Sequence, residues 1–153
     1  MRRGPIYKTR KYQNAMKEYH NQAVKKIVEK PEILGIDGLS SETLLCKAFE
    51  FPELIKKGQE TGDLILLYSP HLGKWVILVI EVQVGSFRSG GYAIFKLRKT
   101  RDYLMSHWRE WFRSVELDFP KDYTLWIETD FVSYAGKAIW EQPWVKRRTK
   151  QIL

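Results

Sequence analysis

The chain has 153 residues, of which 44% are hydrophobic, so it can bury one ordinary core and is expected to form a single domain over residues 1–153. Cys46 is the single cysteine, and no apolar run approaches the roughly 20 residues of a bilayer-spanning helix. We therefore expect an intracellular, cytoplasmic protein with neither a disulfide framework nor a membrane partner. The formal net charge of +8 indicates a polyanionic partner such as nucleic acid, although a solvated cationic surface would give the same charge.

Helical signals come first along the chain. Apolar residues recur at nearly helical spacing over residues 12–29, which predicts a first helix that ends before Pro31. The next segment predicts a short second helix that runs through Ala48. Ser40 or Ser41 is expected to cap it, because Ser commonly occupies the residue before a helix.

Strand and helix patterns alternate over the rest of the chain. Two apolar strands, at residues 62–68 and 74–84, are expected to form a hairpin around a turn that contains Pro and Gly. A long helix is predicted over residues 92–113 and a further strand over 123–132. The last, basic segment is expected to be partly helical around Pro143. This order predicts an α/β fold, a small central mixed sheet of about four strands flanked by helices.

The second strand of the hairpin carries a carboxylate in an otherwise apolar run. A turn centred near residues 71–72 places Asp63 opposite or nearly opposite Glu81, and the period of two places Gln83 on the same face as Glu81. Two carboxylates about 4 Å apart repel by roughly 4 kcal/mol at an effective dielectric constant of 20. The pair therefore needs a shared proton, a Lys or Arg partner, or a divalent cation, and a hard cation such as Mg²⁺ suits oxygen ligands best.

These acids resemble the motif of the PD-(D/E)XK nuclease superfamily, which includes restriction enzymes, Holliday-junction resolvases and many viral and archaeal nucleases. The matching residues are Asp63 in ETGDLILLY and Glu81-Val82-Gln83 in VILVIEVQVG. The resemblance covers roughly residues 60–130 and rests on structural context, since the motif is short. It implies a restriction-endonuclease-like core and a Mg²⁺- or Mn²⁺-dependent deoxyribonuclease. Such an enzyme hydrolyses DNA phosphodiester bonds, and the resemblance implies that Asp63 and Glu81 hold the metal.

The family has a Lys at the position of Gln83, where it orients the attacking water, and in some members the basic residue has moved to the following helix. The resemblance therefore implies that Gln83 or Lys96 takes this role, with Lys99 as the reserve. Whether a further acid joins the site is left open. The acids in question are Glu18, Glu42 and Glu50.

Basic residues concentrate near both ends of the chain and in the long helix. The substrate implied by the resemblance is double-stranded DNA, and a homodimer is a further expectation, because many such nucleases dimerise to cut both strands. The candidate DNA-binding residues are Arg88, Arg98, Lys99, Arg101, Lys146, Arg147 and Arg148. Arg88 belongs to GSFRSGGY, which could meet phosphates at a helix N-terminus or simply connect two elements.

Structural explanations for the same residues stay open. Glu81 could discourage aggregation of an apolar edge strand, Gln83 could be a hydrogen-bonded polar residue, and the cations of the long helix could form a solvated face. The three His residues lack zinc-site spacing, so metal ligation by them is not expected. The alternative function is a non-catalytic, basic nucleic-acid-binding protein of the same or a related fold. Cation binding by the acid pair separates the two.

Overall fold

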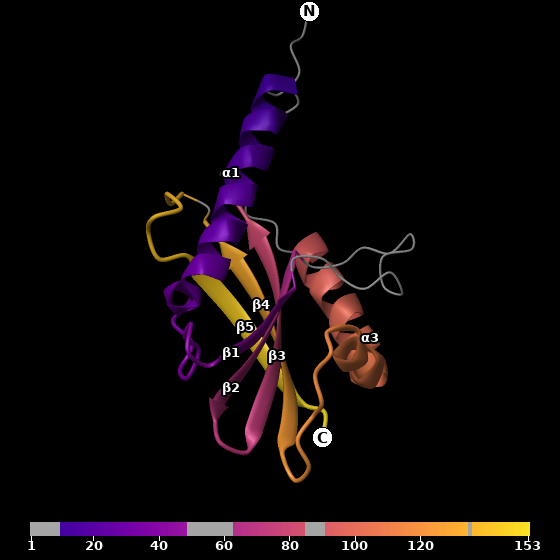
Figure 1. The fold of residues 1–153 in the computed structure, drawn as a ribbon. Coiled ribbons are helices and arrows are strands. Elements are labelled where there is room, and N and C mark those ends of the chain that lie inside the picture. The colour runs from indigo at the N-terminus through magenta and orange to yellow at the C-terminus, as the bar shows by residue number, and fades with distance from the viewer. Residues whose placement is uncertain (1–9, 49–62, 85–90, 135) are drawn as a thin grey trace, which may run out of the picture.

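The computed structural model describes residues 10–48, 63–84, 91–134 and 136–153. Within these residues, five strands form one mixed sheet that lies between two long helices (Figure 1). The α/β class is confirmed, with five strands in place of about four. The elements in chain order are α1 (Arg10–Glu29), the 3-10 helix η2 (Pro31–Leu34), β1 (Leu44–Ala48), β2 (Leu64–His71), β3 (Lys74–Gln83), α3 (Gly91–Ser114), β4 (Thr124–Ser133) and β5 (Trp144–Gln151).

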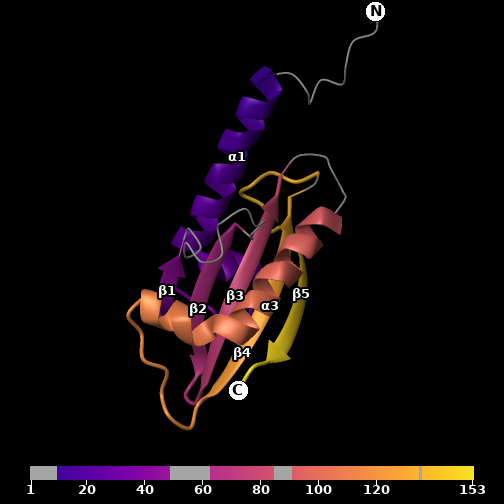
Figure 2. The ribbon, with the colours of Figure 1, turned by 90° about the vertical axis from the view of Figure 1, so that its right-hand side faces the viewer.

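The strands lie side by side in chain order, β1-β2-β3-β4-β5. β3 and β4 are parallel, and the other neighbours are antiparallel. A parallel pair needs a long crossover, and α3 provides it by running back across one face of the sheet (Figure 2). α1 covers the opposite face and extends beyond the end of the sheet. In the described part of the chain, neither helix is long and apolar enough to cross a membrane.

The predicted hairpin is confirmed in its register. Its turn lies at Leu72 and Gly73, one residue later than expected, and Gly73 has a φ of +90°, which suits glycine. An irregularity between Tyr68 and His71 compensates for the shift, so that Leu64 pairs with Ile80. The sequence arithmetic therefore gives the correct cross-strand neighbours where the acids lie.

The predicted helix through Ala48 is wrong, because this segment forms β1. The Ser40 hydroxyl does cap a turn, since it accepts hydrogen bonds from the backbone N–H groups of Glu42 and Thr43 at 3.2 and 3.3 Å. The turn contains a backbone hydrogen bond, from the N–H of Leu44 to the carbonyl oxygen of Ser40. Leu44 then pairs with Tyr68 of β2. Pairing with a neighbouring strand outweighs the local cap signal.

The helical expectation around Pro143 is also wrong, because β5 begins directly after Pro143 and pairs with β4. A proline cannot donate a ladder hydrogen bond, so it fits a position just before a strand. Alternation along β5 then sends Lys146, Arg148 and Lys150 toward one face of the sheet and Arg147 toward the other.

The core consists of two apolar layers, one on each face of the sheet. Even-numbered residues of β2 and β3 pack against α1, and odd-numbered residues pack against α3. Each fully buried aliphatic side chain stabilises the fold by about 1.5–3 kcal/mol, so the two layers fix the orientation of both strands. The fully buried members include Ile27, Leu64, Leu66, Leu78 and Ile80 on the α1 face and Ile65, Ile77, Leu104 and Trp111 on the α3 face.

Candidate active site

Asp63 lies directly before β2, one step beyond the pair formed by Leu64 and Ile80, and is therefore in register with Glu81. Its backbone N–H donates to the carbonyl oxygen of Ile80 at 2.9 Å. Its Oδ2 accepts a hydrogen bond from the backbone N–H of Val82 at 2.8 Å. Backbone contacts on both sides of Glu81 thus hold Asp63 in place, and Asp63 lies opposite Glu81 as the turn arithmetic predicted.

Glu81 points to the α3 face, where Lys96 meets it. The distance between Lys96 Nζ and Glu81 Oε1 is 2.5 Å, and the two side chains are 17% and 7% exposed. The other carboxylate oxygen, Oε2, is buried and has no hydrogen-bond partner among the residues that the structure describes. One oxygen of Glu81 is therefore paired, and the other remains able to take a further ligand.

The pKa of Glu81 is raised to about 7, chiefly by burial and then by the nearby Asp63, whereas Lys96 and His20 act in the opposite direction. An ordinary glutamate is fully ionised at neutral pH. The raised pKa brings the protonated form of Glu81 within reach of neutral pH, so a partner that favours the ionised form changes the charge of Glu81. A cation bound at Oε2 would do so.

His20 is the residue of this site that the sequence reasoning missed. It projects from α1, and its Nε2 lies 3.0 Å from Asp63 Oδ2. The hydrogen bond to Asp63 is the largest of the effects that raise the pKa of His20 above 6.5, and burial partly opposes it. The available signal was helical spacing, because His20 precedes the buried Ala23 and Ile27 by three and seven residues and so shares their face.

The further acids proposed from sequence do not join the pair in the described structure. Glu18 and Glu42 are exposed, and Glu50 lies outside the described residues. Among residues 10–48, 63–84, 91–134 and 136–153, no group of three or more His, Cys, Asp or Glu side chains could by itself hold a metal ion. Asp63 and Glu81 could supply two oxygen ligands, which fits a hard cation that takes its remaining ligands from water and substrate oxygens.

The two lysines proposed for catalysis have different positions. Lys96 contacts the acid pair, whereas Lys99 is exposed, with its Nζ 5.4 Å from the centre of the Phe95 ring. Gln83 is half-buried at the end of β3, two residues after Glu81, and pairs in register with Ser133 of β4. Lys96 is therefore the proposed basic residue that the fold brings to the carboxylates.

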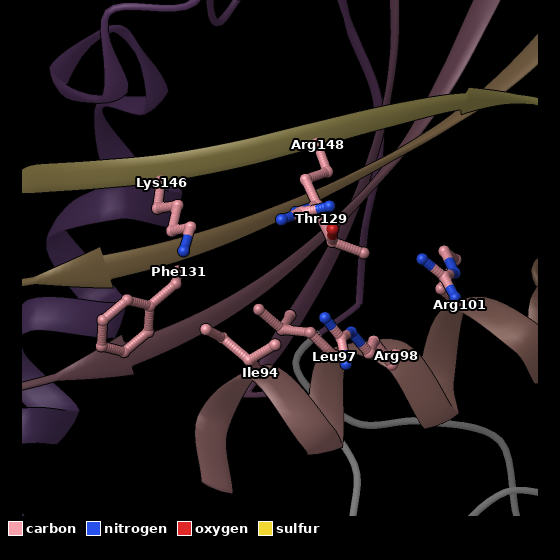
Figure 3. Close-up of a pocket in the computed structure, with 8 residues that line it drawn as sticks. All are labelled: Ile94, Leu97, Arg98, Arg101, Thr129, Phe131, Lys146 and Arg148. Atoms are coloured by element: carbon pink, nitrogen blue, oxygen red, sulfur yellow. The ribbon is translucent and has the colours of Figure 1, made fainter. Parts of the chain in front are cut away.

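A narrow basic cleft of about 40 Å³ lies between α3 and the last two strands. Lys146 and Arg148 reach toward α3 from β5 across Thr129 and Phe131 of β4 (Figure 3). Phe131 of β4 pairs in register with Glu81 of β3. One wall of the cleft is therefore formed by the strand next to the one that carries the Glu81 carboxylate. The cations that line it are Arg98, Arg101, Lys146 and Arg148.

Two candidate DNA-binding residues that the structure describes, Lys99 and Arg147, do not line this cleft. Arg147 faces the opposite side of the sheet, where its Nη2 lies 3.3 Å from Oδ2 of the buried Asp130. The positive charge of Arg147 is therefore paired with a buried carboxylate of the fold. Arg88 lies outside the described residues.

Two exposed aromatic rings lie near Lys96 on α3. Tyr92 and Phe95 are about half exposed and stack with their ring centres 6.5 Å apart. Lys96 Nζ lies 5.3 Å from the centre of the Tyr92 ring. Rings interleaved with cations suit the bases and phosphates of a nucleic acid.

Comparisons of the chain with protein-family models, with curated proteins and with solved structures find no match.

Proposed function

We propose that the protein is a metal-dependent nuclease that hydrolyses phosphodiester bonds in DNA. The observation that carries the proposal is the state of Glu81, whose Oε1 meets Lys96 while its buried Oε2 has no partner in the described structure. Asp63 lies in register beside it. The order of helix, three antiparallel strands, helix and parallel strand supports the same proposal, because the resemblance to PD-(D/E)XK nucleases implies it.

A divalent cation held by Asp63 and Glu81 would act as a Lewis acid and lower the pKa of a bound water. The side chains of the chain have separate roles. Lys96 favours the ionised form of Glu81 and can donate a hydrogen bond to an attacking water or to a phosphate oxygen. His20 holds the orientation of Asp63. Gln83, at the end of the same strand, offers an amide that can orient water without adding charge.

The basic cleft supplies the substrate contacts in this proposal. Phe131 of the cleft lies on the strand next to Glu81, and Lys146 and Arg148 lie one strand further on, so a backbone bound along the cleft would extend toward the carboxylates. Contacts of Lys and Arg to phosphate position the substrate and carry no base specificity. Affinity for DNA is therefore expected to fall steeply with salt concentration.

The test compares digestion of plasmid and linear duplex DNA in Mg²⁺, Mn²⁺ and EDTA by the wild-type protein, Glu81→Gln and Glu128→Gln. Glu128 is a matched control, because it is a buried acid on the other face of the sheet. We expect metal-dependent cleavage by the wild type and Glu128→Gln, and none by Glu81→Gln, with DNA binding retained by all three. Full cleavage by Glu81→Gln would refute the assignment of the site.

One observation favours a non-catalytic DNA-binding protein as the second candidate. Lys96 already compensates the charge of Glu81, so the acid pair can be accommodated without a cation. Wild-type protein that binds DNA with the expected salt dependence but cleaves neither substrate in either metal would support this alternative.

A further inference from the structure

A second cavity lies on the α1 face of the sheet and shares no lining residue with the acid pair Asp63 and Glu81. It has a volume of about 500 Å³, within the usual range for small-molecule sites. It opens between the segment after η2, the turn end of the β2–β3 hairpin and the strands β4 and β5. Its lining includes Ile36, Tyr68, Lys74, Val76, Trp126, Glu128, Arg147 and Thr149.

Two buried carboxyl groups stand at its inner end. Glu128 lines the cavity and is 4% exposed, and Asp130, two residues along β4, is fully buried. Glu128 Oε2 and Asp130 Oδ1 are buried, and within the described residues neither has a hydrogen-bond partner. Arg147 stands between the two groups, with Nη2 3.3 Å from Asp130 Oδ2 and Nε 4.0 Å from Glu128 Oε2.

These unmet groups are acceptors, which determines the kind of ligand that fits. A buried acceptor without a partner costs free energy. Arg147 also donates to the carbonyl oxygen of Leu34 at 3.0 Å, so its donors are shared among several acceptors. A ligand with N–H donors would satisfy Glu128. The guanidinium beside both carboxyl groups makes a metal ion a poor occupant.

We propose that this cavity binds a planar ligand through two adjacent N–H donors that pair with the carboxylate of Glu128. Parallel N–H bonds to a carboxylate are a strong arrangement. Tyr68, Val76 and Trp126 provide apolar walls for a flat body. Two sources present this chemistry, an amidinium or guanidinium group and the Watson–Crick edge of guanine. The proposal does not rest on nuclease activity.

Ligand binding should displace a proton. The pKa of Glu128 is raised to about 8, chiefly by burial and then by Asp130, whereas Arg147 and Lys74 act in the opposite direction. Asp130 has a pKa raised by burial to about 6. Glu128 therefore holds a proton at pH 7 and must lose it to accept two N–H donors, so affinity should rise from pH 6 to pH 8. The titratable and charged groups that line the cavity with Glu128 are Asp37, Tyr68, His71, Lys74 and Arg147, and Asp130 lies two residues along the same strand.

The experiment is calorimetric titration of the full chain with two probes, benzamidine and guanosine, at pH 6, 7 and 8. Benzamide and inosine are matched controls, because each lacks one of the two donors or the charge. We expect the protein to bind at least one probe saturably and to bind the matching control more weakly. Binding of the probe at pH 7 should release protons. Binding confined to benzamidine identifies an amidinium or guanidinium ligand, and binding confined to guanosine identifies a guanine ligand.

Variants connect binding to the cavity. Glu128→Gln preserves shape and should weaken binding by at least about tenfold, because a charged acceptor is lost. Thr149→Trp, which fills the cavity beside Glu128, should do the same, whereas Glu110→Gln on the exposed face of α3 should have no effect. Thermal unfolding checks that each variant is folded. Absence of binding by both probes, or binding that survives both cavity variants, would overturn the proposal.

Discussion

Lys96 in the second turn of α3 and Glu81 near the end of β3 form a buried ion pair, with 2.5 Å between Nζ and Oε1. The pair lies beside Asp63, which is itself bonded to His20. Four charged or titratable side chains from α1, the start of β2, β3 and α3 therefore meet at one point. The two apolar layers hold those elements rigidly, so the distances at this point depend on the packing of the whole sheet.

Glu81→Gln should leave the metal-free protein as stable as the wild type or more stable at pH 8. Glu81 has a pKa of about 7 in the folded chain against an ordinary value of 4.5, so the folded state binds more protons and the wild type loses stability between about pH 4.5 and pH 7. Because Gln does not ionise, the substitution avoids up to about 3 kcal/mol of this loss of stability. Part of that gain is cancelled, because Lys96 loses its partner. Urea unfolding in EDTA at pH 5 and pH 8 measures the effect.

The matched control for this change is Glu110→Gln, which alters an exposed acid on α3. Its stability should stay within about 0.5 kcal/mol of the wild type at both pH values. A loss of several kcal/mol in Glu81→Gln at pH 8 would mean that Glu81 acts as a structural partner of Lys96, as expected when one member of a buried ion pair is removed.

Lys96→Ala and Lys99→Ala form a matched pair on one helix. Lys96 contacts the acid pair and Lys99 does not, so we expect Lys96→Ala to lower the cleavage rate by roughly 10²–10³. Lys99→Ala should change it little, and Lys96→Arg should restore part of the rate. Single-turnover cleavage at saturating protein separates this effect from DNA binding. Equal losses in both variants would indicate that α3 contributes general charge only.

The register of the acids was predictable because it depends on local information. Two apolar strands joined by a short turn can pair in few ways, and a one-residue slip would have turned Glu81 into the other apolar layer. The irregularity between Tyr68 and His71 could not be foreseen, but it left the pairing of Leu64 with Ile80 as expected. Lys96 was named only from the resemblance to the nuclease family, and its ion pair with Glu81 is a finding of the structure.

Long-range pairing was not predictable from the same signals. β1 and β5 are edge strands whose segments carry cap and proline signals of other structures, and each is a strand because it has a neighbour to pair with. The same limit hid the second carboxyl pair, because Glu128 and Asp130 follow an ordinary alternating pattern. Only the alternation of β5 places Arg147 beside them and leaves Arg148 on the other face.

Alternation along β5 gives its two arginines different roles: Arg148 lines the basic cleft, and Arg147 pairs with the buried Asp130. The double variant Lys146→Ala, Arg148→Ala should lower the salt dependence of DNA affinity by about two phosphate contacts, roughly 0.9 each in the slope, with little change in stability. Arg147→Ala should keep the slope but lose about 3–5 kcal/mol of stability, because Asp130 would be left buried without its partner. Binding titrations at several salt concentrations, with urea unfolding, test both. A reduced slope in Arg147→Ala alone would contradict the assignment of faces.

His20→Ala should lower stability more at pH 5.5 than at pH 8.5. The pKa of His20 is raised above 6.5 by its bond to Asp63, so the stabilisation is fully present below pH 6.5 and is lost as the pH rises through the folded value. Asp63 keeps its bond from the backbone of Val82, so cleavage should fall less than in Asp63→Ala. His71→Ala is the control, because it removes an exposed imidazole that lies at the end of β2 and away from Asp63. A stability loss in His20→Ala that is the same at both pH values would show that His20 contributes by packing. An ion pair with Asp63 requires the protonated ring, so it would make the loss larger at pH 5.5.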